Sequence, residues 1–282
     1  FHGRTTTIIS FSNDPVAREN FGPFTNGFIK IPYDDTEALE HTLKTNSNIA
    51  GFLVEPIQGE AGVYVPTEGY LTKAKALCEA YNVLFIADEV QTGIARTGRL
   101  LATCGNCDCA QKDCSGTPEV KPDILILGKA LSGGVYPVSA VLANDAIMNV
   151  ITPGSHGSTF GGNPIGAAVA MAALDVIKDE QLTDNADRLG NLFRSLLNDY
   201  IATSAIVKLV RGKGLLNAIV INDREDSDTA WNICLKLRDN GLLAKPTHGN
   251  IIRFAPPLVM NEDQLIDCVN IIIKTLKSFE SK

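Results

Sequence analysis

The sequence predicts an α/β protein in which a large domain with a mostly parallel sheet precedes a smaller α+β domain. Two observations support this fold class. Short apolar runs alternate with helical patterns or long loops up to about residue 178, which is typical of parallel strands wrapped by helices. From about Asp179 onward, long helical patterns flank short strands. We therefore expect a large domain over residues 1–178 and a small domain over residues 179–282.

The strands of the large domain are expected where short apolar runs are bounded by polar residues or glycine. Ile124–Leu127 is the clearest case, because four apolar residues between Asp123 and Gly128 are typical of a strand covered on both faces. The expected elements, in order, are strand Asn48–Glu55, helix Thr67–Tyr81, strands Val83–Ala87, Ile124–Leu127 and Val138–Leu142, and the alanine-rich helix Asn163–Lys178.

The small domain is expected to be mostly helical, with a short sheet beneath the helices. Its expected helices are Leu182–Tyr200, Thr229–Asp239 and Glu262–Phe279, and its expected strands are Gly214–Ile221 and Ile251–Phe254.

Composition narrows the class of protein. The chain has 282 residues and a formal net charge of −7, without a basic run, which argues against nucleic acid as a main partner. No apolar stretch approaches the length of a membrane span. The seven cysteines fit a reducing compartment better than a disulfide framework.

We expect the protein to be located in the cytoplasm, or in the mitochondrial matrix in a eukaryote. No targeting segment is visible, and the first residue is Phe1, so the chain is expected to be part of a longer one.

Polar side chains follow three of the expected strands. Glu55, Asp88 and Lys129 stand at strand ends, and ligands of α/β sheets gather at the carboxyl ends of strands. An ammonium in a poorly hydrated site has a lowered pKa, which makes lysine a nucleophile toward carbonyls. A lysine that binds pyridoxal phosphate also needs an acid beside the ring nitrogen, and Asp88 is placed for that pairing. Taken alone, the segment favours a surface lysine with a buried stem over a nucleophile.

A nucleotide-hydrolysing enzyme is the rival interpretation of Asp88, since an aspartate after a strand can hold Mg²⁺. That class requires the phosphate-binding pattern GxxxxGK[ST]. Here Gly128-Lys129 is followed by Ala130, and the glycine-rich part comes after the lysine. The nucleotide interpretation therefore holds only if such a loop precedes Phe1.

Seven motifs, taken together, resemble one family. In order, they are FHGRT, VEPIQGEAG, IADEVQTGIARTGR, LGKALSGGVYP, HGSTFGGNP, VRGKGLLNAIVI and IIRFAPPL. The chain is similar from its first residue to its C-terminus to the class-III, fold-type-I pyridoxal-phosphate aminotransferases, interrupted only by a cysteine-containing insert. Within the family, the closest likeness is to members that act on ornithine.

The resemblance implies a role for each matching residue. Lys129 would bind pyridoxal phosphate covalently and act as general base, and Asp88 would pair with the ring nitrogen. The other implied contacts of the cofactor are Gln91 with the phenolic oxygen, Val90 and Phe1 with the two ring faces, and Ser158 and Thr159 with the phosphate of the neighbouring subunit. For the substrate, the resemblance implies Arg4 and Arg253 as carboxylate-binding arginines, with Glu60 as the residue that gates Arg253. Arg211 and Lys213 are expected to be turn residues or supports of the fold.

The same resemblance implies an activity and an assembly. The reaction would pass the δ-amino group of ornithine to 2-oxoglutarate, giving glutamate and glutamate semialdehyde, which cyclises to pyrroline-5-carboxylate. The protein would work as a homodimer or a larger assembly. The family's glycine-rich phosphate turn and a substrate-binding aromatic hydroxyl would precede Phe1, in a longer chain or a separate one. The alternatives are an acetylornithine or other ω-amino-acid aminotransferase, and an inactive remnant or regulatory subunit.

The insert carries four cysteines, Cys104, Cys107, Cys109 and Cys114. Four thiolates suit tetrahedral zinc, and the first two have the usual spacing. However, one residue between Cys107 and Cys109 is tight for two ligands of one ion, and all four lie in a single short segment. A surface loop without metal is therefore the favoured interpretation, because surface loops tolerate insertions.

Overall fold

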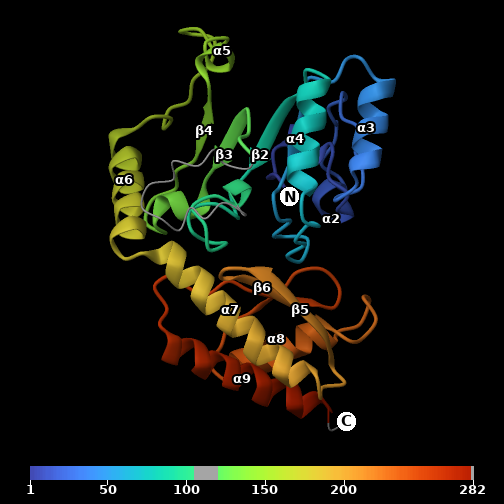
Figure 1. Cartoon of the computed structure of the whole chain (residues 1–282), viewed down its shortest axis with the longest axis vertical. Coiled ribbons are helices and arrows are strands. Elements are labelled where there is room, and N and C mark those ends of the chain that lie inside the picture. The colour runs from blue at the N-terminus through green and yellow to red at the C-terminus, as the bar shows by residue number, and fades with distance from the viewer. Residues whose placement is uncertain (105–119, 281–282) are drawn as a thin grey trace.

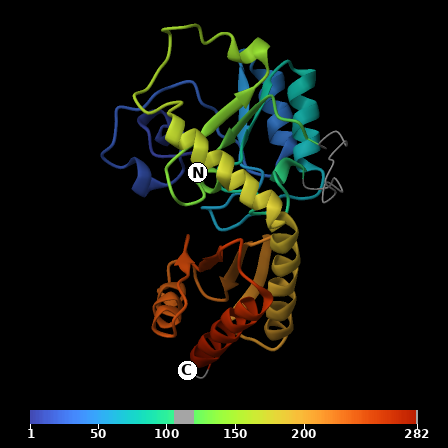
Figure 2. The ribbon, with the colours of Figure 1, turned by 90° about the vertical axis from the view of Figure 1, so that its left-hand side faces the viewer.

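Two four-stranded sheets organise the chain in the computed structural model, which describes residues 1–104 and 120–280 (Figure 1). The first sheet has the order β1-β2-β3-β4, and the second has the order β5-β6-β8-β7. Helices α6 (Pro164–Asp179) and α7 (Leu182–Ile201) follow one another along one side of the molecule and lead from the first sheet to the second (Figure 2). The fold is α/β, with a mixed first sheet.

The first sheet is parallel except at one edge. Strands β1 (Gly51–Val54), β2 (Leu84–Asp88) and β3 (Ile124–Leu127) run parallel, whereas β4 (Ala140–Ala143) runs antiparallel to β3. Helices α3 (Thr36–Thr45) and α4 (Tyr70–Ala80) pack on one face, where Leu39, Tyr70, Ala74 and Phe85 belong to one apolar core. Parallel strands present their carboxyl ends at the same edge, so β1, β2 and β3 deliver their following residues to one place.

Short elements surround this sheet. Asp14 and Asn144 cap two of them, each with its side-chain oxygen accepting from a backbone N–H of the first turn, as N-caps usually do. These elements are α1 (Thr6–Ile9), α2 (Pro15–Arg18), α5 (Asp145–Met148) and the 3-10 turns η1 (Ala102–Cys104) and η2 (Lys129–Ser132).

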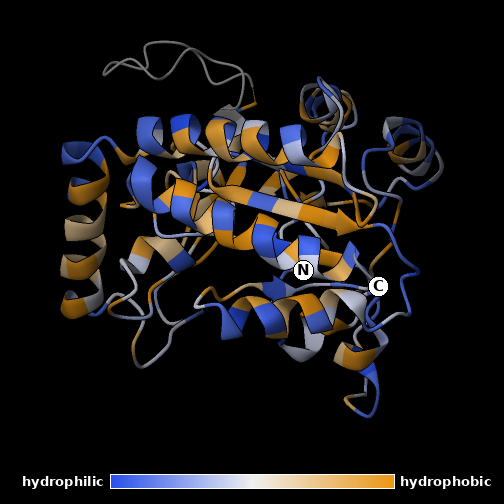
Figure 3. Cartoon of the chain, turned by 90° about the horizontal axis from the view of Figure 1, so that it is seen from below, coloured by the Kyte–Doolittle hydropathy of each residue, from blue (hydrophilic) through white to orange (hydrophobic). Residues whose placement is uncertain are grey.

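The second sheet is antiparallel and carries long helices on one face. Its strands are β5 (Val207–Lys213), β6 (Leu216–Ile221), β7 (Lys245–Pro246) and β8 (Ile251–Phe254), and it packs against α7, α8 (Thr229–Asp239) and α9 (Glu262–Glu280). Hydrophobic and hydrophilic residues alternate along the turns of the long helices (Figure 3). The apolar positions of α7 and α9, such as Leu189, Phe193 and Leu276, are buried in this core, as amphipathic helices require.

The other face of the second sheet is covered by a segment that belongs to the first. The chain after β1 folds back on itself through a bridge between Gln58 and Tyr64. Ile57 and Val63 from this segment form a core with Leu216, Ala218, Val220 and Ile251. β6 is consequently buried along its whole length.

Arg211 fixes this segment to the second sheet. Its guanidinium donates to the carbonyl oxygen of Gly62 from Nε at 3.0 Å and from Nη2 at 2.8 Å. It also lies 3.8 Å from the centre of the Tyr64 ring, within the range of a cation–π contact. Gly62 has a φ of 126°, and a side chain there would come within 2.7 Å of Ile251. Arg211 therefore supports the fold, as the sequence predicts.

A second connection joins the loop after β2 to the second sheet. The Nη1 atom of Arg96 donates to the carbonyls of Leu215 at 3.0 Å and of Pro256 at 2.6 Å. The backbone amide of Leu215 in turn donates to the carbonyl of Arg96. Burial lowers the pKa of Arg96 to about 10. Gly214, with a φ of 50°, allows the close approach, because a Cβ there would lie 2.4 Å from the amide nitrogen of Gly98.

Most expected elements are present, and the differences have physical reasons. Helix Thr229–Asp239 and strands Ile124–Leu127 and Ile251–Phe254 match the prediction at both ends. The expectation that Ile124–Leu127 is covered on both faces is wrong for the described residues, since only Leu127 is buried and the neighbouring β4 is partly exposed.

The domain boundary at Asp179 stays a prediction. None of the helices in the described ranges has the length and apolar character of a membrane span.

Candidate active site

The carboxyl ends of β1, β2 and β3 bring three predicted residues to one edge of the first sheet. Val54 pairs with Ala87, and Asp88 pairs with Ile126, so the residues that follow each strand emerge side by side. Glu55 follows β1, Asp88 ends β2, and Lys129 comes two residues after β3. The sequence-based expectation that these side chains gather at one strand edge is consistent with this register.

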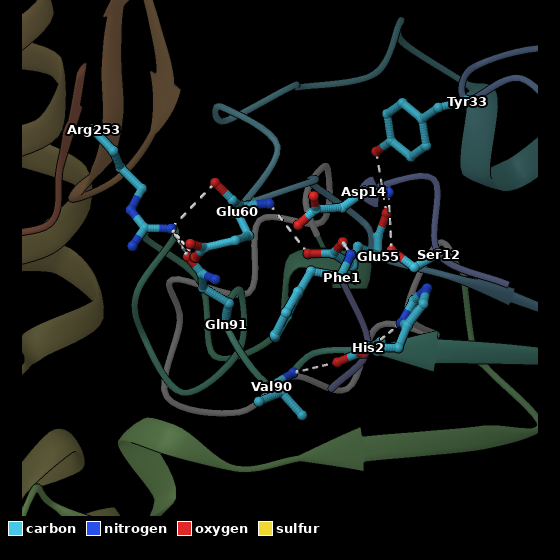
Figure 4. A network of polar contacts seen from close by, with 12 residues as sticks. Phe1, His2, Ser12, Asp14, Tyr33, Glu55, Glu60, Val90, Gln91 and Arg253 are labelled. Atoms are coloured by element: carbon cyan, nitrogen blue, oxygen red, sulfur yellow. Dashed lines mark hydrogen bonds and ion pairs between the residues drawn. The ribbon is translucent and has the colours of Figure 1, made fainter. Parts of the chain in front are cut away.

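Asp88 is held by two donors. Its Oδ1 atom accepts from the backbone amide of Val90 at 3.0 Å, and its Oδ2 atom lies 2.6 Å from Nδ1 of His2 (Figure 4). An ionised carboxylate only accepts hydrogen bonds, so with Asp88 in that state the donor in this pair is the Nδ1–H tautomer of His2. Asp88 is buried, so the two contacts fix the orientation of its carboxylate.

His2 is the residue that the sequence analysis did not identify. The only signal in the sequence is its position inside the motif FHGRT, beside Phe1. Its contact with Asp88 joins residues 86 positions apart, so no local pattern could reveal it.

The neighbouring acid, Glu89, points into the protein and has a different task. Its carboxylate accepts from the Thr92 hydroxyl at 2.5 Å and from the backbone amides of Ala102 and Thr103 at 3.0 and 2.8 Å. Glu89 is fully buried, and burial raises its pKa. Of the two acids in the motif, Asp88 thus faces the strand edge, whereas Glu89 organises the loop that follows.

Lys129 opens the short turn η2 with a φ of 45°, a left-handed conformation that is uncommon outside glycine. Local desolvation lowers the pKa of its amine, and the negative charges of Asp88, Glu55 and Glu60 offset part of this effect. The residue nevertheless keeps access to solvent. An open cavity of about 590 Å³ borders Lys129 and is lined further by the chain from Ser132 to Ser139. The amine is therefore accessible from solvent, and its charge interacts electrostatically with the acids at the neighbouring strand ends.

Phe1 and Arg4 lie together at the start of the chain. The guanidinium carbon of Arg4 is 5.1 Å from the centre of the Phe1 ring, and both residues are exposed. The Oε2 atom of the nearby Glu55 accepts from the amide of Gly59. Figure 4 places Phe1 between Glu55 and Gln91.

Glu60, Gln91 and Arg253 form one network across the two sheets. Nη1 of Arg253 donates to Oε2 of Glu60 at 2.8 Å, to Oε1 of Gln91 at 2.9 Å and to the carbonyl of Gly59 at 3.3 Å (Figure 4). The structure therefore brings Arg253 from β8 to the loops that follow β1 and β2. A Cβ at Gly59 would come within 2.5 Å of the amide end of the Gln91 side chain, so this side chain would have to shift.

Glu60 also contacts a second cation, Lys245, through Oε1. The sequence analysis assigned no role to this lysine. Burial by itself would raise the pKa of Glu60, but hydrogen bonds and charges from Lys245 and Arg253 outweigh it and lower the pKa to about 2. Its carboxylate is therefore ionised at any pH near neutrality.

The remaining predicted residues lie apart from this network. Val90 packs beside Gly128, where a Cβ would approach it to 3.3 Å. Ser158 and Thr159 are exposed in the loop before α6, and the Ser158 hydroxyl accepts from the amide of Gly161 within that loop. Cys107, Cys109 and Cys114 lie outside the described residues, so the structure does not test the choice between a metal-free loop and a zinc site formed with Cys104. Elsewhere in the described ranges, no cluster of side chains suits a metal ion.

Comparison with known proteins identifies the family of this chain. Residues 1–276 match the family described as aminotransferase class-III, and the chain belongs to that family.

Its relatives narrow the likeness further. The mitochondrial ornithine aminotransferase of Drosophila melanogaster is 58% identical over 278 residues, and that of Rattus norvegicus is 56% identical over 279 residues; each alignment covers 99% of this chain and 60% of the relative. The chain thus spans about 60% of the length of these curated relatives.

Solved structures show the same fold. The ornithine aminotransferase of Toxoplasma gondii, crystallised with oxidised glutathione and described as having partial occupancy of pyridoxal phosphate, gives a TM-score of 0.92 at 48% identity; the match covers 100% of this chain and 64% of that one. The acetylornithine aminotransferase of Elizabethkingia anophelis gives a TM-score of 0.83 at 65% identity, covering 90% of this chain and 64% of that one.

Proposed function

We propose that the protein is a pyridoxal-phosphate-dependent ornithine δ-aminotransferase with 2-oxoglutarate as amino acceptor. The observation that carries this proposal is the amine of Lys129, with its lowered pKa, near Asp88 and the Glu60–Arg253 pair. The amine and the acid suit amino transfer, and the masked arginine suits an enzyme that must accept substrates with one and with two carboxylates near the reaction centre. The predicted products are glutamate and glutamate semialdehyde, which cyclises.

The residues present suit pyridoxal phosphate. Asp88 offers a buried, oriented carboxylate for a ring N–H, Lys129 offers an amine, and Phe1 offers an exposed aromatic face. When bound, this cofactor supplies an electron sink for the carbon that carries the transferred amine. Lys129 would hold the cofactor covalently and later move a proton at its Nζ atom. Gln91 and Val90 would position the ring, and Ser158 and Thr159 would serve the phosphate of a neighbouring subunit.

An assay with the full-length protein tests the proposal. Purified protein with added pyridoxal phosphate should convert ornithine and 2-oxoglutarate to glutamate and pyrroline-5-carboxylate, both of which can be quantified directly. A protein that stays colourless with the cofactor and forms neither product would instead be the inactive remnant.

An acetylornithine aminotransferase is the second candidate, and the 65% identity to the Elizabethkingia anophelis protein favours it. The two substrates differ at the α-nitrogen, which is a cation in ornithine and a neutral amide in acetylornithine. The kcat/KM values for both, measured on the same preparation, decide between the two functions.

The Glu60–Arg253 pair leads to a prediction about substrate choice. Ornithine presents its δ-amine, so a second carboxylate-binding cation near the reacting carbon has to be masked. Glutamate presents its α-amine next to a carboxylate that requires this cation. Glu60→Ala should leave Arg253 open and shift the ratio of kcat/KM for glutamate over ornithine upward by about tenfold, which corresponds to about 1.4 kcal/mol of differential binding. An equal loss with both substrates would rule out masking by Glu60.

We also propose a homodimer or larger assembly with active sites shared between subunits. Supporting this, several large apolar side chains are exposed on β4, α6 and the loop before α6: Val141, Leu142, Phe160, Ile165, Met171 and Val176. Exposed apolar groups of this extent usually mark an interface. For the compartment we propose the cytoplasm or the mitochondrial matrix, the latter matching the names of the insect and rat relatives.

Subunit mixing tests the shared site. Co-expression of the full-length Lys129→Ala variant with a Ser158→Ala, Thr159→Ala variant should restore roughly a quarter of wild-type activity, because half of randomly formed dimers then hold one intact site of two. Each variant alone serves as the control and should be inactive. Hybrid preparations that remain inactive would place both sets of residues in the same subunit's site.

A further inference from the structure

Lys245 and Arg253 occupy directly opposed positions on neighbouring strands. In the antiparallel pair of β7 and β8, Lys245 is the register partner of Arg253. Directly opposed residues of such a pair project from the same face, with Cβ atoms about 4.5–5.5 Å apart. Like charges at this spacing repel, so this position requires an anion between the two side chains.

Glu60 supplies that anion and divides its carboxylate between the two cations. Oε2 accepts from Nη1 of Arg253 at 2.8 Å, and Oε1 contacts Nζ of Lys245. The surroundings of the two cations differ: the side chain of Arg253 is 15% exposed, whereas that of Lys245 is 56% exposed. Leaving Arg253 without an anion therefore costs more free energy than leaving Lys245 without one, because water hydrates Lys245 more easily.

We propose that Lys245 is a specificity-determining residue that retains the Glu60 carboxylate when a second substrate carboxylate takes Arg253. The inference rests on the proposed aminotransferase function. When a dicarboxylate displaces Glu60 from Arg253, one Glu60 oxygen already contacts Lys245, so the displaced anion keeps a cationic partner. This lowers the free energy needed to unmask Arg253. Ligands with a single carboxylate leave the Glu60–Arg253 pair intact, so their binding does not depend on the contact between Glu60 and Lys245.

Equilibrium binding to the full-length holoenzyme tests the role without turnover. Glutarate represents the dicarboxylate substrates, and valerate, which has one carboxylate and no amine to transfer, represents the monocarboxylate ligands; calorimetry measures both Kd values. Lys245→Gln should weaken glutarate binding by about fivefold, the effect of one solvent-exposed ion pair, and change valerate binding less than about twofold. Lys245→Arg should restore glutarate binding. Lys208→Gln, at an exposed position of β5, is the matched control.

The outcomes separate this inference from the proposed function. A selective loss of glutarate affinity in Lys245→Gln, with rescue in Lys245→Arg, supports the role. Equal weakening of both ligands, or tighter glutarate binding, overturns it while wild-type turnover of ornithine leaves the proposed function standing. A wild-type holoenzyme that neither binds glutarate nor converts ornithine overturns both.

Discussion

Lys129→Ala should abolish covalent attachment of pyridoxal phosphate and with it the aminotransferase activity. The variant loses both the nucleophile and the group that moves the proton, and loss of proton transfer alone typically costs about 10²–10⁴-fold in rate. The measurement is borohydride reduction of the full-length protein with cofactor, followed by mass spectrometry of the peptide that contains residue 129. Wild-type protein should carry the reduced cofactor on this peptide.

Lys121→Ala is the control for this experiment, since Lys121 is an exposed lysine shortly before β3. It should keep both label and rate. A Lys129→Ala variant that retains the borohydride-trapped label and normal turnover would show that another amine is the nucleophile.

Asp88→Asn should reduce turnover by about 10²–10⁴-fold, the usual range for a lost acid–base partner, while some cofactor still binds. The asparagine keeps the size of the side chain and can still accept a hydrogen bond from the Val90 amide. However, a neutral amide cannot stabilise a protonated ring nitrogen as a carboxylate does.

The cofactor's absorption spectrum and the rate, measured together, separate binding from chemistry in this variant. Asp199→Asn, at an exposed position of α7, is the matched control and should resemble wild type. Unchanged turnover in Asp88→Asn would remove Asp88 from the proposed role.

The parts of the site that follow predicted strands could be located from the sequence. Asp88 comes directly after an apolar run and Lys129 follows another after one glycine, and the parallel register of such strands brings their ends together. The contact of Glu60 with Arg253 is also present, although it was expected from resemblance and not from spacing. The chemical roles of all these residues stay predictions.

Other features depend on contacts between distant segments, which local patterns do not encode. His2 and Asp88 are 86 positions apart, and β7 has only two residues, so neither the histidine contact nor the alignment of Lys245 with Arg253 has a periodic signature. The coverage of β3 is another such property, because it depends on which segments pack over the strand. Short helices such as α1 and α2 have a single turn each and too few residues to show a helical period.

The hydrogen bonds of Arg96 limit how far the second sheet can move from the loop after β2. Asp88 and Gln91 lie in the same short segment as Arg96, which is bonded to the sheet that carries Arg253. These hydrogen bonds resist movement of the second sheet relative to the loop after β2, and therefore resist a change in the span from the Lys129 amine to Arg253. In an aminotransferase of the proposed kind, this span would determine how many carbons can separate the reacting centre from a substrate's carboxylate. Selection by chain length would then depend on the backbone around Arg96 and Leu215.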